Sequence, residues 1–327
     1  MEPALSILIA TQGRVPQLKR LLDSLVGLEN RAEIPHEILV ANNAQGKAIA
    51  TTVEALLQKY RADEPERWIH VREPIPGKSR ALNRLLPLAK ANLLAFLDDD
   101  VEVAPEWLRI TWQFFRDYSY DVMQGSILVP PSMQNDEQFL RLLNRYRTIC
   151  YYGQPGLEVH EIVSLNGANI ALRRELLNLI GLFDERIGPG ASGTSMDVEF
   201  GERVLRAERR IGYESRSVVY HDVDWSRLTE SYFKRRHELQ GRSRAIYKRS
   251  GVFSSLANLL RATFGFFLYS ALRNERKIYR SKGRIYHYRA MLKEASRTTL
   301  GPLLAASSIP SGPPALNESE AREHKSS

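Results

Sequence analysis

The chain is predicted to form an α/β domain with a mostly parallel central sheet, followed by a basic helical extension. Short apolar runs alternate with amphipathic segments from Leu5 to about Leu108, the pattern of parallel strands joined by crossover helices. Polar residues gather where these strands end, and doubly wound sheets bind nucleotides at that edge. Beyond Trp225 the strand pattern stops and basic helices begin. With 327 residues the chain has room for one large domain and a tail, or for two domains.

The first part of the chain predicts four strands separated by helices. Strands are expected at Leu5–Ala10, Glu37–Ala41, Trp68–Val71 and Leu93–Leu97. Helices are expected to begin near Pro16, Lys47 and Gly77, the second ending near Tyr60. The first of these helices carries an apolar stripe at helical spacing, made of Leu18, Leu21, Leu22 and Leu25. Because strand and helix alternate, helices are expected on both faces of the sheet.

The stretch Leu93–Glu102 carries the strongest functional signal. Its apolar run ends in three adjacent carboxylates, Asp98, Asp99 and Asp100. Alternation along an extended strand would place Asp98 and Asp100 on one face and Asp99 on the other. Three carboxylates this close repel one another, and a hard divalent cation such as Mg²⁺ or Mn²⁺ would relieve that repulsion. The alternative is a solvated acidic turn; the preceding strand and the helix expected after Pro105 favour a site.

Three further polar clusters precede the acidic one. Each lies where a strand ends or a helix begins: Thr11 with Arg14, Asn42 with Asn43, and Lys78 with Arg80. A helix start combines positive side chains with free backbone N–H groups, which suits a diphosphate. Polar residues at one strand end are usually only a turn, but four such clusters in succession favour a nucleotide site.

The second half of the domain is expected to add strands to the same sheet. They are predicted over Met123–Val129, over Val163–Leu172, and within Ile211–Tyr220. Helices are predicted over Phe139–Tyr152, from Arg174 to Gly181, and from Met196 on. The strand over Val163–Leu172 is interrupted by Gly167, and a glycine there permits close approach of a ligand or another backbone.

A glycine-rich loop, Gly188–Ser195, leads directly into Asp197. The composition predicts a mobile loop, and a carboxylate just past it could act on a substrate that the loop covers. The alternative for Asp197 is an N-cap residue with Glu199 supporting the first helical turn, which the sequence alone slightly favours. His221 follows the last strand. Because the chain also carries an acidic cluster, a structural role and a metal-ligand role explain this histidine about equally well.

Composition and charge exclude several classes of protein. The single cysteine, Cys150, excludes an internal disulfide and fits a reducing compartment. The apolar start contains Glu2 and no basic segment, so a strand is expected there and not a signal peptide. Residues 225–300 hold 18 Lys and Arg against 4 Asp and Glu, whereas the remainder holds 28 against 34. Basicity confined to one block indicates a local contact with an anionic surface and not nucleic-acid binding along the chain.

The extension, expected over 225–300, contains the most apolar stretch of the chain, Val252–Leu272. Arg261 near its middle would cost about 2.5 to 3.5 kcal/mol on insertion, which disfavours a membrane span. Apolar residues at helical spacing, followed by a basic cluster from Arg273 on, are typical of an interfacial helix on anionic lipid. Packing of this face on the first domain (1–224) or on a second subunit is the alternative. Residues 301–327, with proline and glycine from Pro310 on, are expected to be a disordered tail.

Taken in order, these motifs form a specific set, although each is weak alone. They are Thr11-x-x-Arg14, Asn42-Asn43, Gly77 to Asn83, Phe96 to Asp100, Gly167 to Arg173, Gly181 to Glu185, Asp197 to Phe200, and a strand ending at His221. The set resembles the family 2 glycosyltransferases, inverting enzymes with the GT-A fold, over roughly residues 4 to 222. The resemblance implies a nucleotide-sugar donor, linked to UDP, GDP or dTDP, and a divalent cation on an Asp-x-Asp (DXD) motif.

The resemblance also implies a role for each site residue. Asp100, with His221, would bind the cation, and Asp197 would be the general base that takes a proton from the acceptor hydroxyl. The donor nucleotide and its diphosphate would lie among Thr11, Arg14, Asn42, Lys78, Asp98 and Asp99. The donor or acceptor sugar would lie near Gly167, Asn169 and Glu199.

The implied enzyme is cytoplasmic, peripheral on the inner face of the plasma membrane, and transfers a sugar to a glycan or lipid-linked acceptor in polysaccharide biosynthesis. Association into homo-oligomers stays open. Two positions depart from the family pattern: Asn42 stands where Asp is usual, and Met196 where Glu is usual. A nucleotidyltransferase, a donor-binding protein without turnover, and a scaffold or nucleic-acid-binding protein are the alternatives.

Overall fold

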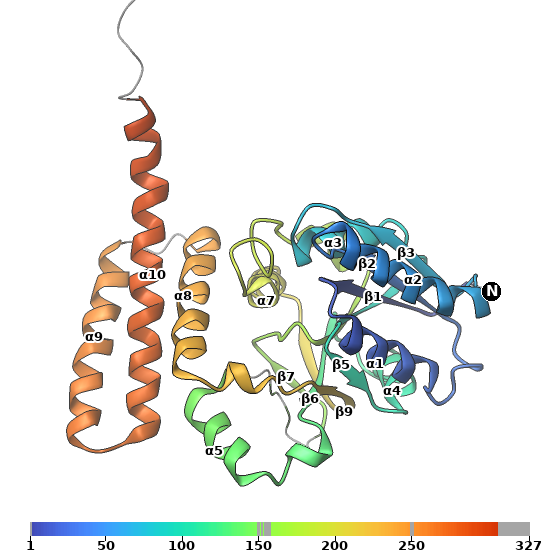
Figure 1. Cartoon of the computed structure of the whole chain (residues 1–327), viewed down its shortest axis with the longest axis horizontal. Coiled ribbons are helices and arrows are strands. Elements are labelled where there is room, and N and C mark those ends of the chain that lie inside the picture. Colours follow the sequence, from blue (N-terminus) through green and yellow to red (C-terminus); the bar gives the residue numbers. More distant parts are fainter. Residues whose placement is uncertain (1, 149–150, 152, 154–157, 249–251, 307–327) are drawn as a thin grey trace, which may run out of the picture.

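The computed structural model describes residues 2–148, 151, 153, 158–248 and 252–306. These residues form an α/β domain followed by three long helices (Figure 1). The described strands make one nine-stranded mixed sheet in the order β3-β2-β1-β4-β8-β6-β9-β5, with β7 paired to β9. Cys150 lies outside the described residues.

The predicted parallel half of the sheet is present. It consists of β1 (Leu5–Thr11), β2 (His36–Asn42), β3 (Trp68–Arg72) and β4 (Leu93–Asp98). β1 and β2 are buried along their whole length, as continuous apolar runs require when helices cover both faces. The register pairs Ala10 with Asp98 and Thr11 with Asn42, so the strand-end clusters meet at one edge.

The other half of the sheet is mixed in direction. β8 (Asn169–Arg173) runs antiparallel between β4 and β6 (Val122–Leu128), and β9 (Ile211–His221) runs parallel to β6. Two short strands, β5 (Val101–Val103) and β7 (His160–Ile162), pair antiparallel with β9. The sequence did not predict these two, because three residues are too few to show an alternating pattern.

The strand predicted over Val163–Leu172 is wrong in its first part, because residues 163–168 belong to no strand. Their backbone bonds to side chains and not to a ladder. The N–H of Asn166 donates to Gln124 Oε1 at 2.7 Å, and that of Gly167 donates to Asp197 Oδ2 at 2.8 Å. The glycine interruption therefore marks the place where this segment leaves the sheet and meets a side chain from another element.

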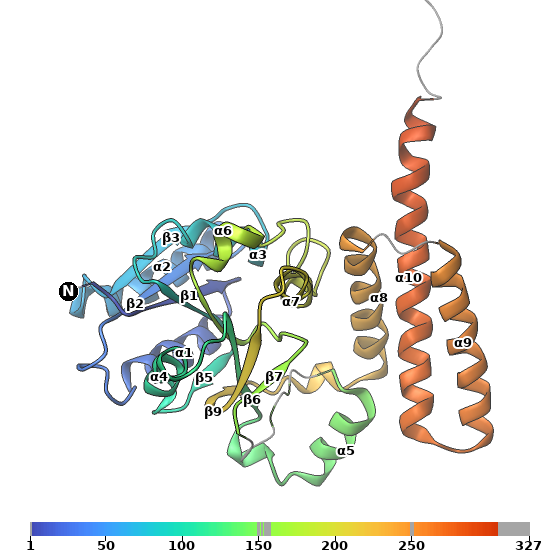
Figure 2. The same ribbon diagram turned by 180° about the vertical axis from the view of Figure 1, so that it is seen from behind.

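Helices cover both faces of the sheet, as predicted (Figures 1 and 2). One face packs against α1 (Val15–Val26), α2 (Lys47–Asp63) and α4 (Trp107–Asp117). The other packs against α3 (Lys78–Leu85), α6 (Leu176–Ile180) and α7 (Met196–Arg206). Along β1, Ile7 and Ile9 face the first layer while Leu8 and Ala10 face the second, the two-residue alternation of a strand.

A short helical segment leaves the domain at its lower edge in Figure 1. It comprises η1 (Pro131–Met133) and α5 (Glu137–Tyr146). Asp136 caps α5 by accepting a hydrogen bond from the Phe139 N–H at 2.8 Å. The helix ends at Tyr146 and not at the predicted Tyr152, because Arg147 adopts a left-handed conformation with φ of 53°.

After the short η2 (Trp225–Arg227), the extension consists of α8 (Glu230–Tyr247), α9 (Val252–Ala271) and α10 (Glu275–Ala306). α8 lies between the domain and α10, and α9 is outermost (Figures 1 and 2). α10 ends at Ala306, so the prediction of a disordered tail is wrong for residues 301–306. Residues 307–327 lie outside the described part of the chain.

Candidate active site

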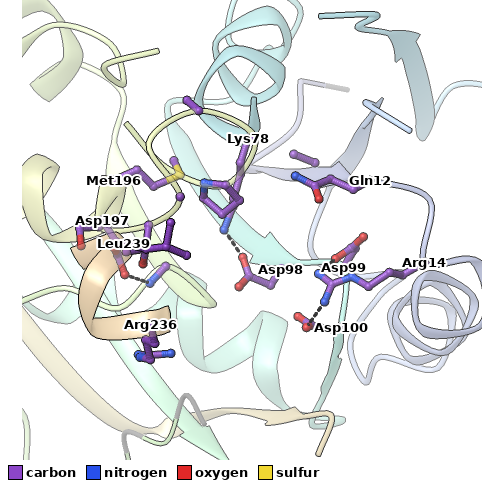
Figure 3. Close-up of a pocket in the computed structure, with 18 of the residues that line it drawn as sticks. Gln12, Arg14, Lys78, Asp98, Asp99, Asp100, Met196, Asp197, Arg236 and Leu239 are labelled. Carbon is purple, nitrogen blue, oxygen red and sulfur yellow. Dashed lines mark hydrogen bonds and ion pairs between the residues drawn. The ribbon is translucent and has the colours of Figure 1, made fainter. Parts of the chain in front are cut away.

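A cavity of about 660 Å³ lies at the carboxyl ends of β1 and β4 (Figure 3). These ends contribute Thr11 and the three aspartates. The loop after α6 and the start of α7 form a second side, with Asp197 and Met196. α8 forms a third side through Tyr232, Arg235, Arg236 and Leu239. The cavity thus joins the strand-end clusters that the sequence predicted to the extension that follows them.

Asp99 and Asp100 are buried, and both carboxylates pair with the side chain of Arg14. The guanidinium of Arg14 forms ion pairs with both (Figure 3). Thr11 Oγ1 donates a hydrogen bond of 2.7 Å to Asp99 Oδ2. Burial raises the pKa of Asp99 above its ordinary value, although Arg14 acts in the opposite direction. Thr11 and Arg14 therefore line the cavity as predicted, but both are engaged in orienting the acidic cluster.

Asp100 has an environment that suits a cation. Its Oδ1 is buried and has no hydrogen-bond partner among the described residues. His221 Nε2 lies 3.6 Å from that atom, while His221 Nδ1 lies 2.7 Å from the carbonyl oxygen of Asp222. When only Nδ1 carries a proton, which it donates to this carbonyl, the Nε2 lone pair of the neutral ring faces the cluster; when Nε2 is protonated as well, His221 is a positive partner of Asp100. Burial works against the charge of Asp100, but His221, Arg14 and Arg227 hold its pKa below the ordinary value.

Asp98 completes a group of donor atoms that fits a divalent ion. One ligand atom each from Asp98, Asp100 and His221 lie within 4.8 Å of one another. Two carboxylate oxygens and one imidazole nitrogen are donors that Mn²⁺ accepts, and carboxylates also suit Mg²⁺. The predicted alternation of faces does not extend over the triplet, because β4 ends at Asp98, and Asp99 and Asp100 lie in the turn that follows. Without an ion, the Lys78 ammonium pairs with Asp98.

Lys78 reaches the cavity by its side chain alone. Two backbone N–H groups at the start of α3 are engaged inside the protein: the Gly77 N–H donates to Asn43 Oδ1 at 3.0 Å and the Lys78 N–H to the Pro189 carbonyl at 2.9 Å. A diphosphate site at the N–H groups of Ser79 and Arg80 stays a prediction. Arg80 does not line the cavity and pairs with Glu185 at 2.8 Å. Burial disfavours the charged ammonium, but Asp98 raises the pKa of Lys78 above its ordinary value.

Asp197 lies across the cavity from Arg14 and Asp99 (Figure 3). It is not an N-cap: Ser195 occupies that position, and the Asp197 carboxylate instead accepts the hydrogen bond from Gly167 N–H. This bond fixes Oδ2, and no other hydrogen bond among the described residues engages Oδ1. Gly167 is close to both Asp197 and Lys78, since an added Cβ would lie 3.5 Å from Asp197 Oδ2 and from Lys78 Nζ.

Three predicted site residues do not line the cavity, because contacts inside the protein occupy them. Asn42 donates to the Ala50 carbonyl at 2.9 Å and accepts from the Ala44 N–H at 3.2 Å. Glu199 is buried in an ion pair of 2.8 Å with Arg203, one turn along α7. Asn169 bonds to strand carbonyls and to Trp107 within the sheet. Each predicted motif contains a neighbour that does line the cavity: Asn43, Asp197 and Gly167.

The loop predicted to be mobile is held at several points. Ser192 Oγ lies 2.7 Å from Ser243 Oγ of α8, and both side chains are buried. The Gly193 N–H donates to the Gly188 carbonyl at 2.8 Å. Gly193 lies so close to α8 that an added Cβ would be 2.5 Å from Leu239. The loop and α8 therefore form one continuous side of the cavity.

Sequence reasoning missed the residues that the extension contributes. Arg227 Nη2 lies 3.4 Å from Asp100 Oδ2, so the start of the extension reaches the acidic cluster. Tyr232, Arg235, Arg236 and Leu239 recur at three- and four-residue intervals along α8, which places them on one helix face. This interleaving of aromatic and basic residues was visible in the sequence, but only the tertiary packing shows which way that face points.

The sheet topology and the acidic cluster together define a glycosyltransferase domain of the GT-A type. The family model for glycosyl transferase family 2 matches residues 6–181, and the chain belongs to this family. It is therefore a glycosyltransferase. A search of curated proteins gave no match.

Solved structures agree with this fold. The chain is similar to a mannosyltransferase from Pyrobaculum calidifontis in complex with GDP-Man and Mn²⁺, with 17% identity, a TM-score of 0.51, and coverage of 95% of this chain and 77% of the other. It is similar to S. aureus TarS 1-349 in complex with UDP-GlcNAc, with 15% identity, a TM-score of 0.50, and coverage of 92% of each chain. It also resembles GalNAc-T7 with UDP, GalNAc and Mn²⁺, with 15% identity, a TM-score of 0.52, and coverage of 92% of this chain and 58% of the other. At these identities the likeness concerns the fold.

Proposed function

We propose that this protein is a metal-dependent inverting glycosyltransferase that moves a sugar from a nucleotide-sugar donor to a hydroxyl of a glycan or lipid-linked acceptor. One observation carries the proposal: Asp197 lies in the same cavity as the Asp98–Asp100–His221 group, on the opposite side. One side of the cavity thus suits the leaving diphosphate, and the other suits the acceptor. The nucleotide-sugar ligands of the similar structures support a donor of this class.

In this reaction the acceptor hydroxyl attacks the anomeric carbon of the donor from the side of Asp197. The acceptor O–H bond breaks and its proton passes to the Asp197 carboxylate, while the new C–O bond forms. The bond from the anomeric carbon to the diphosphate oxygen breaks, and the nucleoside diphosphate leaves with the electron pair. A hydroxyl is a weak nucleophile, and a positioned base typically contributes about 10²- to 10⁴-fold. A single displacement inverts the anomeric configuration.

The residues of the acidic cluster prepare the leaving side. Asp98, Asp100 and His221 would hold the divalent cation, which stabilises charge on the departing diphosphate. Thr11 and Arg14 fix Asp99 and Asp100 in place. Lys78, paired with Asp98, supplies a positive charge beside the position proposed for the phosphates. Arg227 adds a further positive charge from the extension.

A screen of nucleotide sugars tests the proposal. The full chain is heated with UDP-, GDP- and dTDP-sugars, with and without Mn²⁺, because a ligand that binds only the native state raises the unfolding temperature. A metal-dependent rise with one nucleotide class is expected, and Asp100→Ala should abolish it. If no nucleotide sugar stabilises the wild-type chain with either Mn²⁺ or Mg²⁺, the proposed donor class is wrong.

A binding protein without turnover is the alternative that one residue favours. Met196 stands where the family usually carries Glu, and its side chain is largely buried, with Sδ 3.6 Å from Ser79 Oγ. The methionine packs between α3 and the loop at Gly188 and supplies no charge to the acceptor side. Release of the sugar from a bound donor, to an acceptor or to water, separates an enzyme from such a binding protein.

We also propose that α9 attaches the enzyme to an anionic membrane surface on the cytoplasmic side. Apolar side chains of α9 are exposed, with Phe253, Phe264 and Phe267 at 87%, 71% and 66%. Arg273, Arg276 and Lys277 are exposed at the turn that follows. By length and composition α9 is the one described helix that could cross a bilayer. The exposed Arg261 near its middle supports a position in the interface over a span.

A further inference from the structure

A second cavity, of about 720 Å³, lies between α5, α8 and α10. Seven arginines line it, more than any other residue type: Arg145, Arg147, Arg236, Arg244, Arg276, Arg280 and Arg284. Aromatic rings lie among them, from Tyr146, Phe233, Tyr279 and Tyr288. No aspartate or glutamate is among the described residues that line it. A cavity of this composition has a strongly positive field and many N–H donors.

Most of this positive charge has no ion-pair partner in the part of the chain that the structure describes. Arg145 pairs with Glu275 at 2.7 Å, and Arg244 with Glu202 at 3.6 Å. Arg147, Arg276, Arg280 and Arg284 make no ion pair among the described residues. Guanidinium groups match phosphate and carboxylate in geometry and form two parallel hydrogen bonds with them. An anion would therefore find four uncommitted guanidiniums around one cavity.

The two histidines of the cavity add little to this charge at neutral pH. Burial, followed by the nearby Arg236, lowers the pKa of His237 to about 4. Burial and Arg244 lower the pKa of His287 to about 4. The imidazoles are therefore neutral and can hydrogen-bond to a polar ligand, while the arginines supply the charge. Hydrogen-bonding side chains and aromatic rings beside guanidiniums suit a charged carbohydrate better than an acyl chain.

Arg236 connects this cavity to the active site. It lines both cavities, and its Nη1 donates to the Thr148 carbonyl at 2.8 Å. On one face of α8, Tyr232, Arg235 and Leu239 line the active-site cavity. On another face, Phe233, His237 and Gln240 line the second cavity. α8 therefore separates the two cavities by the width of a helix, and Figure 3 places Arg236 on the same side of the active site as Asp197.

We propose that the second cavity binds phosphate or carboxylate groups of an extended anionic acceptor, whose hydroxyl reaches Asp197 while its charged units lie against α5, α8 and α10. This inference rests on the proposed function and names its acceptor class. A lipid headgroup is the less suitable occupant. No α9 residue lines the cavity, and α9 lies on the opposite side of α10 from α8 (Figures 1 and 2).

Charge reversal at two distal arginines tests the cavity. Arg280 and Arg284 are exposed, one turn apart on α10, and away from the active-site cavity. The double variant Arg280→Glu/Arg284→Glu should bind tripolyphosphate, titrated calorimetrically in metal-free buffer, at least about tenfold more weakly than wild type. The matched control is Arg289→Glu/Lys293→Glu, with the same charge change and spacing on α10 but outside the cavity.

Transfer assays test the acceptor. Wild type should prefer phosphorylated or carboxylated oligosaccharides over neutral ones by at least about tenfold in kcat/KM, and Arg280→Glu/Arg284→Glu should lose that preference while still releasing sugar from the donor to water. Retained donor hydrolysis keeps this test separate from the proposed function, which fails if the wild type binds no donor or binds a donor without cleaving it.

Two results would overturn the inference. The first is unchanged tripolyphosphate affinity in Arg280→Glu/Arg284→Glu; if this variant also loses binding to phosphatidylcholine–phosphatidylglycerol vesicles, the cavity is assigned to lipid headgroups. The second is an equal loss of tripolyphosphate affinity in the control, which would mean a diffuse electrostatic effect.

Discussion

Adjacent carboxylates in this site share only part of their surroundings: Arg14 pairs with both Asp99 and Asp100, but each aspartate also has an environment of its own. Asp98 meets Lys78, Asp99 meets Thr11, and Asp100 keeps one buried oxygen without a hydrogen bond. The triplet as a functional group could be predicted from its position after a strand. The partner of each carboxylate could not, because it depends on how α3 and the end of β1 approach β4. The same holds for Asn42, which is buried in its own turn while Asn43 lines the cavity.

Asn169 illustrates how a family motif can mark a structural residue. Its amide donates to the carbonyls of Ser126 and Ser217 at 3.0 and 2.9 Å and accepts from Trp107 Nε1 at 3.0 Å. Asn169→Ala would leave these buried groups without partners. Each unpaired group lowers the free energy of unfolding by up to about 3 kcal/mol. We expect a loss of about 3 kcal/mol in the free energy of unfolding, measured by urea denaturation.

Donor affinity distinguishes the two roles of Asn169. At a temperature where Asn169→Ala is folded, its affinity for the nucleotide sugar identified by screening should equal that of wild type. Normal stability combined with lost donor binding would place Asn169 in the donor site and contradict the structural role.

At the scale of elements, α8 has two functions in the fold. One face completes the active-site cavity, and another packs tightly on α10. At the crossing, an added Cβ on Gly241 would lie 2.1 Å from the carbonyl oxygen of His287, so no other residue fits. The wall of the active site is therefore positioned by the packing of the extension.

Gly241→Ala should separate α8 from α10. Backbone atoms at the contact cannot yield as a flexible side chain would, and overpacking typically costs about 1 to 3 kcal/mol. We expect a lower unfolding temperature and weaker binding of the acceptor. Gly265→Ala in α9 is the control, since its Cβ would meet the Ser281 hydroxyl at 3.2 Å, which can rotate away. Equal stability of the two variants would show that the crossing is looser than described.

The regular elements were largely predictable, and the exceptions have physical reasons. Buried strands and amphipathic helices in the parallel half carry their own periodicity. The segment before β8 does not, because its backbone bonds to Gln124 and Asp197 side chains distant in the sequence. The glycine-rich loop has the composition of a mobile segment, but α8 holds it through Ser192 and Ser243.

At the scale of the whole molecule, the extension has an arginine-lined cavity between α5, α8 and α10, and exposed apolar side chains on α9. Figure 2 shows that α9 is the outermost helix. The sequence pattern changes near residue 225, where the division of the chain was predicted. The active-site cavity nevertheless includes residues from beyond that point, because Arg227 and α8 line it. The charge asymmetry has two parts: arginines that line cavities and basic residues exposed beside α9.

Membrane attachment predicts a specific loss on polar substitution of α9. Phe264→Ser/Phe267→Ser removes two exposed rings, each worth about 1.5 to 3 kcal/mol when buried in lipid. Sedimentation with vesicles that contain phosphatidylglycerol should show at least about tenfold weaker binding, and binding by wild type should weaken with salt. Val163→Ser, at another exposed apolar residue, serves as the control. Equal binding by the phenylalanine variant and wild type would contradict attachment through α9.

The proposed mechanism depends on Asp197 as the general base, and Asp197→Asn tests this role most directly. The variant keeps the size of the side chain and an oxygen for the Gly167 N–H, but it cannot accept a proton. Glu199→Gln, two residues along the same helix and paired with Arg203 outside the cavity, is the matched control. We predict that Asp197→Asn binds the donor with wild-type affinity and lowers kcat for transfer by about 10²- to 10⁴-fold, while folded Glu199→Gln transfers normally. Transfer by Asp197→Asn at the wild-type rate would contradict the mechanism.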